Sequence, residues 1–239
     1  MVLLAVFGFE VMRVQGQAAV LRSDPEAVLT TPALRRTAVA RGGPVYQRYC
    51  SSCHGAEGKG DHGGGVPDFS DGTHLYGQGR VAEIEEIARH GIRADDKQGF
   101  DLASMPAFGT AHPYKAEPLP SLTPGQMEDI TQYLLAFTGR ATRPDAAQRG
   151  GALYRDYGGC YDCHGYNGEG DDAIGAPALT DEVWLYGHGS HDDIYRTLEH
   201  GRAGMSPAFG RVLNADQLRD VAVYVASLEP SNAKPAGPR

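Results

Sequence analysis

The sequence lacks the main features of membrane-spanning and nucleic-acid-binding proteins. No uninterrupted apolar run reaches the roughly 18 residues that a membrane-spanning helix needs. Basic side chains are few: 22 Lys and Arg stand against 30 Asp and Glu, which gives a net charge of -8. Phosphate binding needs a basic patch, so this charge argues against nucleic acid as a partner. It favours instead protein partners that present a basic face.

The two ends of the chain differ from its middle. Residues 1–9 are apolar or Gly, but no positive residue precedes them, and Glu10 and Arg13 interrupt the stretch. An incomplete export signal, part of a membrane anchor and an interfacial segment all remain open, and each would allow membrane association. We predict an N-terminal apolar segment and linker over residues 1–40, and a flexible tail over residues 231–239.

Cysteine is scarce, and its placement is the strongest signal in the sequence. All four cysteines fall in two copies of the pentapeptide C-x-x-C-H, which is the attachment pattern of c-type haem. Two thiols three positions apart on a helical turn can each add to one vinyl group of the same porphyrin, and the adjacent His then faces the iron. The pattern predicts two covalently attached haem c groups, held through Cys50, Cys53, Cys160 and Cys163, with His54 and His164 as proximal ligands.

Other uses of paired cysteines fit poorly. A zinc ribbon places its two C-x-x-C pairs about 15–20 residues apart, whereas here 106 residues separate Cys53 from Cys160. A thioredoxin-like motif would occur once and would not need an adjacent His, and a disulfide framework would not use identical pentapeptides.

The two motifs belong to an internal repeat. A shift of 110 residues aligns the cysteines, and shifts of 101 and 91 align segments further along the chain. The first copy therefore carries two extra loops, at residues 94–104 and 110–121. The repeat predicts two homologous haem domains, at residues 41–140 and 141–230.

Helix signals occur at matching places in both copies. Residues 81–90 and 192–200 are predicted as helices that end at Gly91 and Gly201. Each copy closes with a longer predicted helix. One begins at Thr123 with a capping-box Gln three residues later, and the other begins at Asn214 in the same way. No convincing strand alternation is present, so the predicted fold is all-α.

A haem used for electron transfer usually has a second axial ligand, and Met raises the reduction potential. Met105 directly precedes Pro106 in the first copy, whereas Met205 is separated from Pro207 by Ser206. We predict Met105 and Met205 as distal ligands, because a flexible thioether can absorb a shift of one residue.

Several aromatic and basic residues are predicted near the haems. Tyr76, Trp184 and Tyr186 lie where side chains would pack against the porphyrin, with their polar atoms seeking partners such as the propionates. Arg93 and Arg202 follow the helix-ending glycines. Each could pair with a propionate or lie solvated at the surface.

These motifs resemble one family. The sequence is similar to the dihaem cytochrome c subunit of cbb-type haem–copper oxidases over roughly residues 42–229, and residues 175–187 are the most distinctive match. The resemblance implies two tandem class I cytochrome c-like domains, each wrapped around one haem. It also implies that the protein receives electrons from a reduced carrier and passes them to the oxidase core.

We therefore predict an exported dihaem electron carrier rather than an enzyme in its own right. In a bacterium it would lie in the periplasm or at the periplasmic face of the inner membrane. Three alternatives remain open. The first is a dihaem peroxidase with an open distal site, suggested by the shifted Met205. The others are the electron-accepting subunit of a periplasmic dehydrogenase, and a docking subunit that binds its partner through the extra loops.

Overall fold

The structure is a computed structural model that describes residues 15–61, 63–111, 113 and 119–229. Within these residues the regular structure is helical, and only isolated β-bridges occur. The all-α prediction is confirmed. Residues 15–22 are helical, and the helices that follow are α2 (Pro25–Thr30), α3 (Pro32–Tyr49), α4 (Ser51–His54), α5 (Val81–His90), α6 (Pro124–Ala136), α7 (Pro144–Arg155), α8 (Tyr161–His164), α9 (His191–His200) and α10 (Ala215–Ala226).

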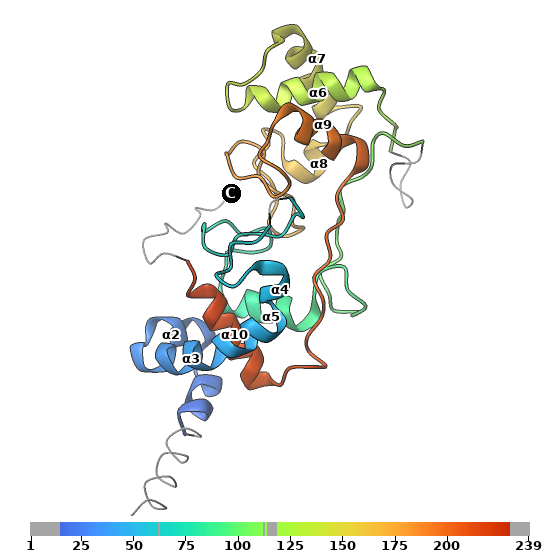
Figure 1. The fold of residues 1–239 in the computed structure, drawn as a ribbon. Coiled ribbons are helices and arrows are strands. Elements are labelled where there is room, and N and C mark those ends of the chain that lie inside the picture. Colours follow the sequence, from blue (N-terminus) through green and yellow to red (C-terminus); the bar gives the residue numbers. More distant parts are fainter. Residues whose placement is uncertain (1–14, 62, 112, 114–118, 230–239) are drawn as a thin grey trace, which may run out of the picture.

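The helices gather into two units that lie one above the other in Figure 1. The upper unit contains α6, α7, α8 and α9, and all of its parts come from residues 105–201. We call it the continuous unit. The lower unit contains α2, α3, α4, α5 and α10, from residues 15–92 and 206–229. We call it the split unit, because the continuous unit interrupts its sequence.

This arrangement exchanges the closing helices of the two sequence repeats. Helix α6, which closes the first repeat, packs against α7 and α9, whereas α10, which closes the second repeat, packs against α3 and α5. In Figure 1 the red α10 accordingly lies beside the blue α3, far from the orange α9 that precedes it. The boundaries proposed at 41–140 and 141–230 thus describe repeats of sequence, and each repeat contributes to both units.

Two connecting segments link the units and pair with each other. Ile92 and Ser206 exchange two backbone hydrogen bonds, each 2.9 Å long. Met105 and Arg202 form the equivalent pair, with bonds of 2.8 and 3.0 Å. Because Ile92 corresponds to Arg202 in the repeat, the pairing is reciprocal, and Ser206 holds the backbone position that corresponds to Met105.

Each connecting segment also caps a helix of the unit that it enters. The amide of Phe108 donates to the carbonyl of Leu198 in α9, and the amide of Phe209 donates to that of Ala88 in α5. The predicted C-terminal glycines are confirmed: Gly91 and Gly201 have φ of 72° and 65°. A side chain there would be strained, and its Cβ would also meet the backbone of the entering segment. These bonds satisfy carbonyls that a helix end otherwise leaves without partners.

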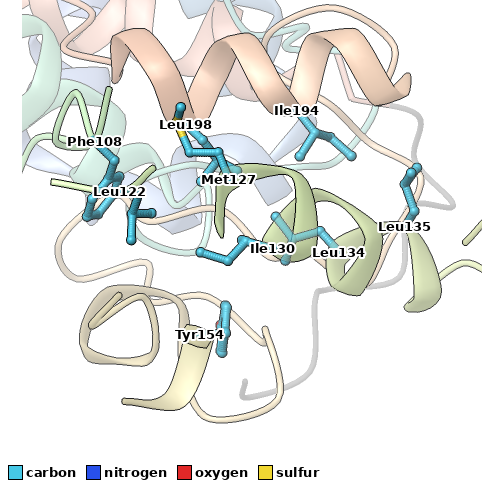
Figure 2. Close-up of a cluster of buried hydrophobic side chains, with 9 residues drawn as sticks. All are labelled: Phe108, Leu122, Met127, Ile130, Leu134, Leu135, Tyr154, Ile194 and Leu198. Carbon is cyan, nitrogen blue, oxygen red and sulfur yellow. The ribbon is translucent and has the colours of Figure 1, made fainter. Parts of the chain in front are cut away.

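Glycines let the helices of each unit cross closely. A Cβ atom on Gly150 of α7 would overlap the carbonyl of Asp129 in α6, and one on Gly42 of α3 would overlap the carbonyl of Asp220 in α10. A tyrosine from each helix packs beside the crossing, with Tyr133 and Tyr154 in one unit corresponding to Tyr224 and Tyr46 in the other. Figure 2 shows the core cluster of the continuous unit, where residues of α6 face side chains from both α9 and α7.

The N-terminal region differs from the prediction. Residues 15–22, 25–30 and 32–49 are helical, so the expected linker before residue 41 is wrong. Val20, Val28 and Ala38 are buried in a cluster with residues of α5 and α10, because these helices cover the outer side of the split unit. Start signals were present in the sequence. The Asp24 side chain accepts hydrogen bonds from two amides of α2, and Pro begins both α2 and α3.

The predicted apolar stretch at residues 1–9 and the tail at 231–239 lie outside the described residues. Among the residues that are described, no helix is both long enough and apolar enough to span a bilayer.

Candidate haem sites

Both C-x-x-C-H motifs form the same compact turn. In α4 the amide of His54 donates to the carbonyl of Cys50 at 3.0 Å, and in α8 the amide of His164 donates to that of Cys160 at the same distance. None of the four cysteines is in a disulfide bond. Burial raises the pKa of Cys50 to about 11 and that of Cys160 to about 12, so both are protonated at neutral pH. The turn thus presents two thiols and an imidazole from one short segment.

The imidazole of His164 is held in one tautomer. Its Nδ1 lies 2.9 Å from the carbonyl oxygen of Pro177, which can only accept a hydrogen bond, so Nδ1 carries the proton. The other nitrogen, Nε2, then keeps its lone pair for a metal. Burial lowers the pKa of His164, which favours the neutral form that ligates iron.

His54 has a related but looser environment. Its ring stacks on Phe69 with centroids 4.2 Å apart, and burial lowers its pKa as it does for His164. The carbonyl of Pro67, the counterpart of Pro177, faces the ring and opposes this shift. It does not form a hydrogen bond of normal geometry, and Nδ1 of His54 is buried without a partner among the described residues. The two histidines predicted as proximal ligands are therefore not held equally.

The distal candidate Met105 lies in the continuous unit. Its half-buried side chain packs against the cluster that contains Ile194 and Leu198, and Cys160 and Trp184 pack against the same cluster. The repeat alignment places Met105 in the same copy as His54, but the structure brings it to the unit that holds His164. The alignment could not show this, because a segment can make equivalent contacts with either copy.

The second distal candidate is not brought into either core. Met205 is 64% exposed, whereas the next residue, Ser206, is the one that pairs with Ile92 in the position matching Met105. In extended backbone, neighbouring side chains point to opposite sides. The register therefore directs residue 206 to the side that Met105 faces in the other unit.

The predicted pocket tyrosines cross between the units. Tyr76, only 5% exposed, packs over Gly175, and Tyr186 packs over Gly65 so closely that a Cβ on either glycine would overlap the ring. The tyrosines therefore form a reciprocal contact between the split and continuous units. Both tyrosines were predicted to line the haem pockets. Their contacts with the glycines were not predicted, because each tyrosine and its glycine belong to different sequence repeats.

The two predicted propionate-binding arginines differ. Arg93 uses its guanidinium within the protein: Nη1 donates to the Tyr76 hydroxyl at 3.1 Å, and Nε donates to the carbonyl of Gly204 at 2.5 Å. Arg202 lies over the Tyr186 ring at 4.4 Å, and its Nη2 donates to Thr197 at 2.7 Å. Its Nε is buried with no hydrogen-bond partner among the described residues. Such a donor fits a ligand carboxylate, because buried polar groups are normally paired.

A pocket lies between the segments that follow the two motifs. It is bounded by corresponding residues of the two repeats, including Pro67 and Pro177, and Leu75 and Leu185, with Trp184 at one side. The sequence contained a signal for Pro67 and Pro177, since the 110-residue shift aligns them, but their role next to the histidines was missed. Pro177 therefore both lines this pocket and holds the His164 ring.

The residues present fit two covalently bound haems. Each turn supplies two thiols outside any disulfide bond and a buried neutral imidazole. Met105 supplies a thioether, and Arg202 supplies a buried donor without a hydrogen-bond partner among the described residues. A bare metal ion has no comparable site: the described part of the chain contains no group of three or more His, Cys, Asp or Glu residues placed to bind one.

Comparisons with known proteins give the same cofactor class. Residues 39–138 match the family model described as cytochrome c, and residues 145–225 match that of cytochrome c oxidase, cbb3-type, subunit III. The cbb3-type cytochrome c oxidase subunit FixP of Azorhizobium caulinodans is 32% identical over 218 residues, covering 91% of this chain and 69% of the relative. Subunit CcoP of Azospirillum brasilense is 33% identical over 216 residues, covering 88% and 68%.

A third relative, subunit CcoP of Rhodobacter capsulatus, is 35% identical over 216 residues, which is 87% of this chain and 66% of the relative. Among solved structures, a chain of the Kuenenia stuttgartiensis reducing HAO-like protein complex is 20% identical and covers 80% of this chain and 96% of its own length. Its TM-score of 0.20 is too low for a structural argument.

Proposed function

Since the chain belongs to the family of cbb3-type cytochrome c oxidase subunits CcoP and FixP, we propose that it delivers electrons to the catalytic core of such an oxidase. It is a dihaem electron-transfer cytochrome with two haem c groups. The observation that carries the proposal is the pair of matching C-x-x-C-H turns, each with two cysteines outside any disulfide bond and a buried imidazole.

We assign the haem-binding residues by unit. In the split unit, Cys50 and Cys53 would hold one haem and His54 would bind its iron. In the continuous unit, Cys160 and Cys163 would hold the other, with His164 proximal and Met105 distal. When bound, each haem supplies reversible one-electron chemistry, and the protein tunes its potential.

The chain contributes orientation and electrostatics. The Pro177 carbonyl fixes the His164 ring and increases its basicity toward iron through the hydrogen bond at Nδ1. A thioether ligand such as that of Met105 stabilises the reduced state and raises the potential. The buried Nε of Arg202 would pair with a propionate and offset its negative charge.

The junction between the units suggests the route between the haems. The segments that follow both C-x-x-C-H turns border one shared pocket, so the proximal sides of the two sites approach each other there. At this junction Tyr76 of the split unit packs on Gly175, and Tyr186 of the continuous unit packs on Gly65. The residues at this junction, rather than the connecting segments, would lie between the two turns that hold the haems.

The proposed setting is outside the cytoplasm, where four otherwise free thiols can be consumed by haem attachment. The net charge of -8 favours a donor cytochrome with a basic face around its haem edge. The acceptor would be the core subunits of the oxidase.

The proposal is tested by spectroelectrochemistry on the full chain after haem attachment. We expect two covalent haems per chain and two reversible one-electron steps, together with co-purification with oxidase core subunits. A chain with two redox-active haems that never associates with an oxidase would keep the electron-carrier function and reject the oxidase partner. A chain that binds no covalent haem would reject both.

A further inference from the structure

The two units hold their distal segments in the same way but with different residues. Met105 pairs with Arg202 through two backbone hydrogen bonds, and Ser206 pairs with Ile92 in the same geometry. Both segments then continue into Pro-Ala-Phe-Gly and cap a helix of the unit that they enter. The backbone is therefore held equivalently in the two units. The distal segments differ in the side chain at the paired position, which is Met105 in one and Ser206 in the other.

From this register we propose that the haem iron bound by His54 has no side-chain ligand on its distal face and binds a small diatomic ligand there. The proposal rests on haem attachment at Cys50 and Cys53, as assigned above. The protein side chains that commonly ligate haem iron are His, Met, Cys and Tyr, and Ser is not among them. Ser206 is also shorter than Met by about the size of a diatomic molecule, and its hydroxyl could donate to the bound ligand.

Met205 does not replace the missing ligand, because its backbone is held on both sides. The carbonyl of Gly204 accepts a hydrogen bond of 2.5 Å from Nε of Arg93. On the other side, Ser206 is bound to Ile92 through both its amide and its carbonyl. Between these anchors the Met205 side chain points outward and is 64% exposed. Turning it inward would break the contacts that keep the segment in register.

The other described histidines of the split unit are already paired. His74 forms an ion-pair contact with Glu229, and His90 lies 3.4 Å from Glu86 and 3.3 Å from Asp96. Among its described residues the split unit therefore supplies no His or Met on the distal side, unlike the Met-containing site of the continuous unit.

The test uses the full chain with both haems attached, reduced with dithionite and titrated with carbon monoxide. We expect one carbon monoxide per two haems, followed by the shift of the haem absorption band. The haem content and complete reduction are measured on the same sample. If two redox-active haems are present and no carbon monoxide binds, the inference fails while the electron-carrier function stands. If covalent haem is absent, the proposed function is rejected, and the inference that rests on it is rejected as well.

Three variants decide which residues set the stoichiometry. Ser206→Met places a thioether in the register of Met105 and should abolish carbon monoxide binding. Met105→Leu should open the other site and raise the stoichiometry to two per chain. Met205→Leu should leave it at one and leave the reduced spectrum unchanged. If Met205→Leu instead creates a new carbon monoxide site, Met205 is a ligand and the inference is overturned.

Discussion

The continuous and split units perform the same task with opposite chain orders. In the continuous unit the distal segment and α6 come before the haem-binding turn, and in the split unit the equivalent segment and α10 come after it. The contacts are nevertheless equivalent, down to the glycine at each helix crossing. A haem unit of this kind is thus defined by which segments pack together, and the order in which the chain supplies them is free.

The units also differ in how deeply they bury the same ion pair. In the continuous unit, Arg149 makes two hydrogen bonds to Asp129, of 2.7 and 2.8 Å, at the surface. In the split unit, Arg41 lies 2.7 Å from Asp220, whose side chain is only 2% exposed. The N-terminal helices pack over this side of α10 and produce the difference. The same Arg–Asp ion pair is therefore exposed to solvent in the continuous unit and buried in the split unit.

The largest expected effect comes from dividing the chain. A fragment of residues 104–203 contains every element of the continuous unit, so it should fold and hold one covalent haem. A fragment of residues 41–140, the first repeat of the sequence, lacks α10 and should not fold, because α3 and α5 lose the helix against which they pack. Circular dichroism and haem content after co-expression with a haem-attachment system check both. A folded 41–140 fragment with bound haem would contradict the exchange of closing helices between the two repeats.

The next largest effect is expected at the helix crossings. Gly150→Ala should destabilise the protein by about 3 kcal/mol, since the new methyl group would overlap the backbone of Asp129. Hydrogen exchange should show lost protection in α6 and α7 while α3 and α10 are spared. Gly42→Ala should give the reverse pattern.

Gly125→Ala serves as the control for these crossings, because no atom lies within 4 Å of the added Cβ. Loss of protection in α10 after Gly150→Ala would show that the sequence repeats pack separately.

A smaller effect distinguishes the buried ion pair of the split unit. Burial raises the pKa of Asp220 from 3.8 to about 7, although Arg41 and Arg219 act in the opposite direction. Between about pH 4 and pH 7 the folded state then binds more protons at this group than the unfolded state does. Its contribution to stability is fully present below pH 4 and is lost as the pH rises through 7.

Asp220→Asn should accordingly make the stability of the protein less dependent on pH in this window, as measured by urea unfolding at several pH values. An unchanged slope would show that Asp220 remains ionised beside Arg41.

The smallest effect is expected at the capping boxes, where the units should behave alike. The side chains of Thr123 and Asn214 each accept a hydrogen bond from the backbone amide three residues later. Thr123→Ala and Asn214→Ala should each cost about 1 kcal/mol of unfolding free energy. Chemical unfolding measures both, and Thr123→Ser and Asn214→Asp should restore most of the loss. Effects that differ greatly between the two would show that the closing helices are not equivalent.

Sequence reasoning succeeded where structure depends on neighbours in the chain. The bounds of α5, the helix-ending Gly91 and Gly201 and both capping boxes were predicted because each rests on residues a few positions apart. It could not place Met105 in the unit that contains His164, since the two repeats offer equivalent packing surfaces. Tyr76 was placed near a haem, but its contact with Gly175 depends on the junction between units, which leaves no local pattern.

The split unit has a consequence for biogenesis. A chain synthesised from its N-terminus presents residues 50–54 early, whereas α10 comes last among the described helices. All helices of the continuous unit have been synthesised once residue 201 has been added. The split unit, which contains the first C-x-x-C-H turn, still lacks its distal segment and α10, which come from residues 206–226. The split unit therefore stays open until residues 206–226 have been added, and the C-x-x-C-H turn that emerges first is enclosed after the second one.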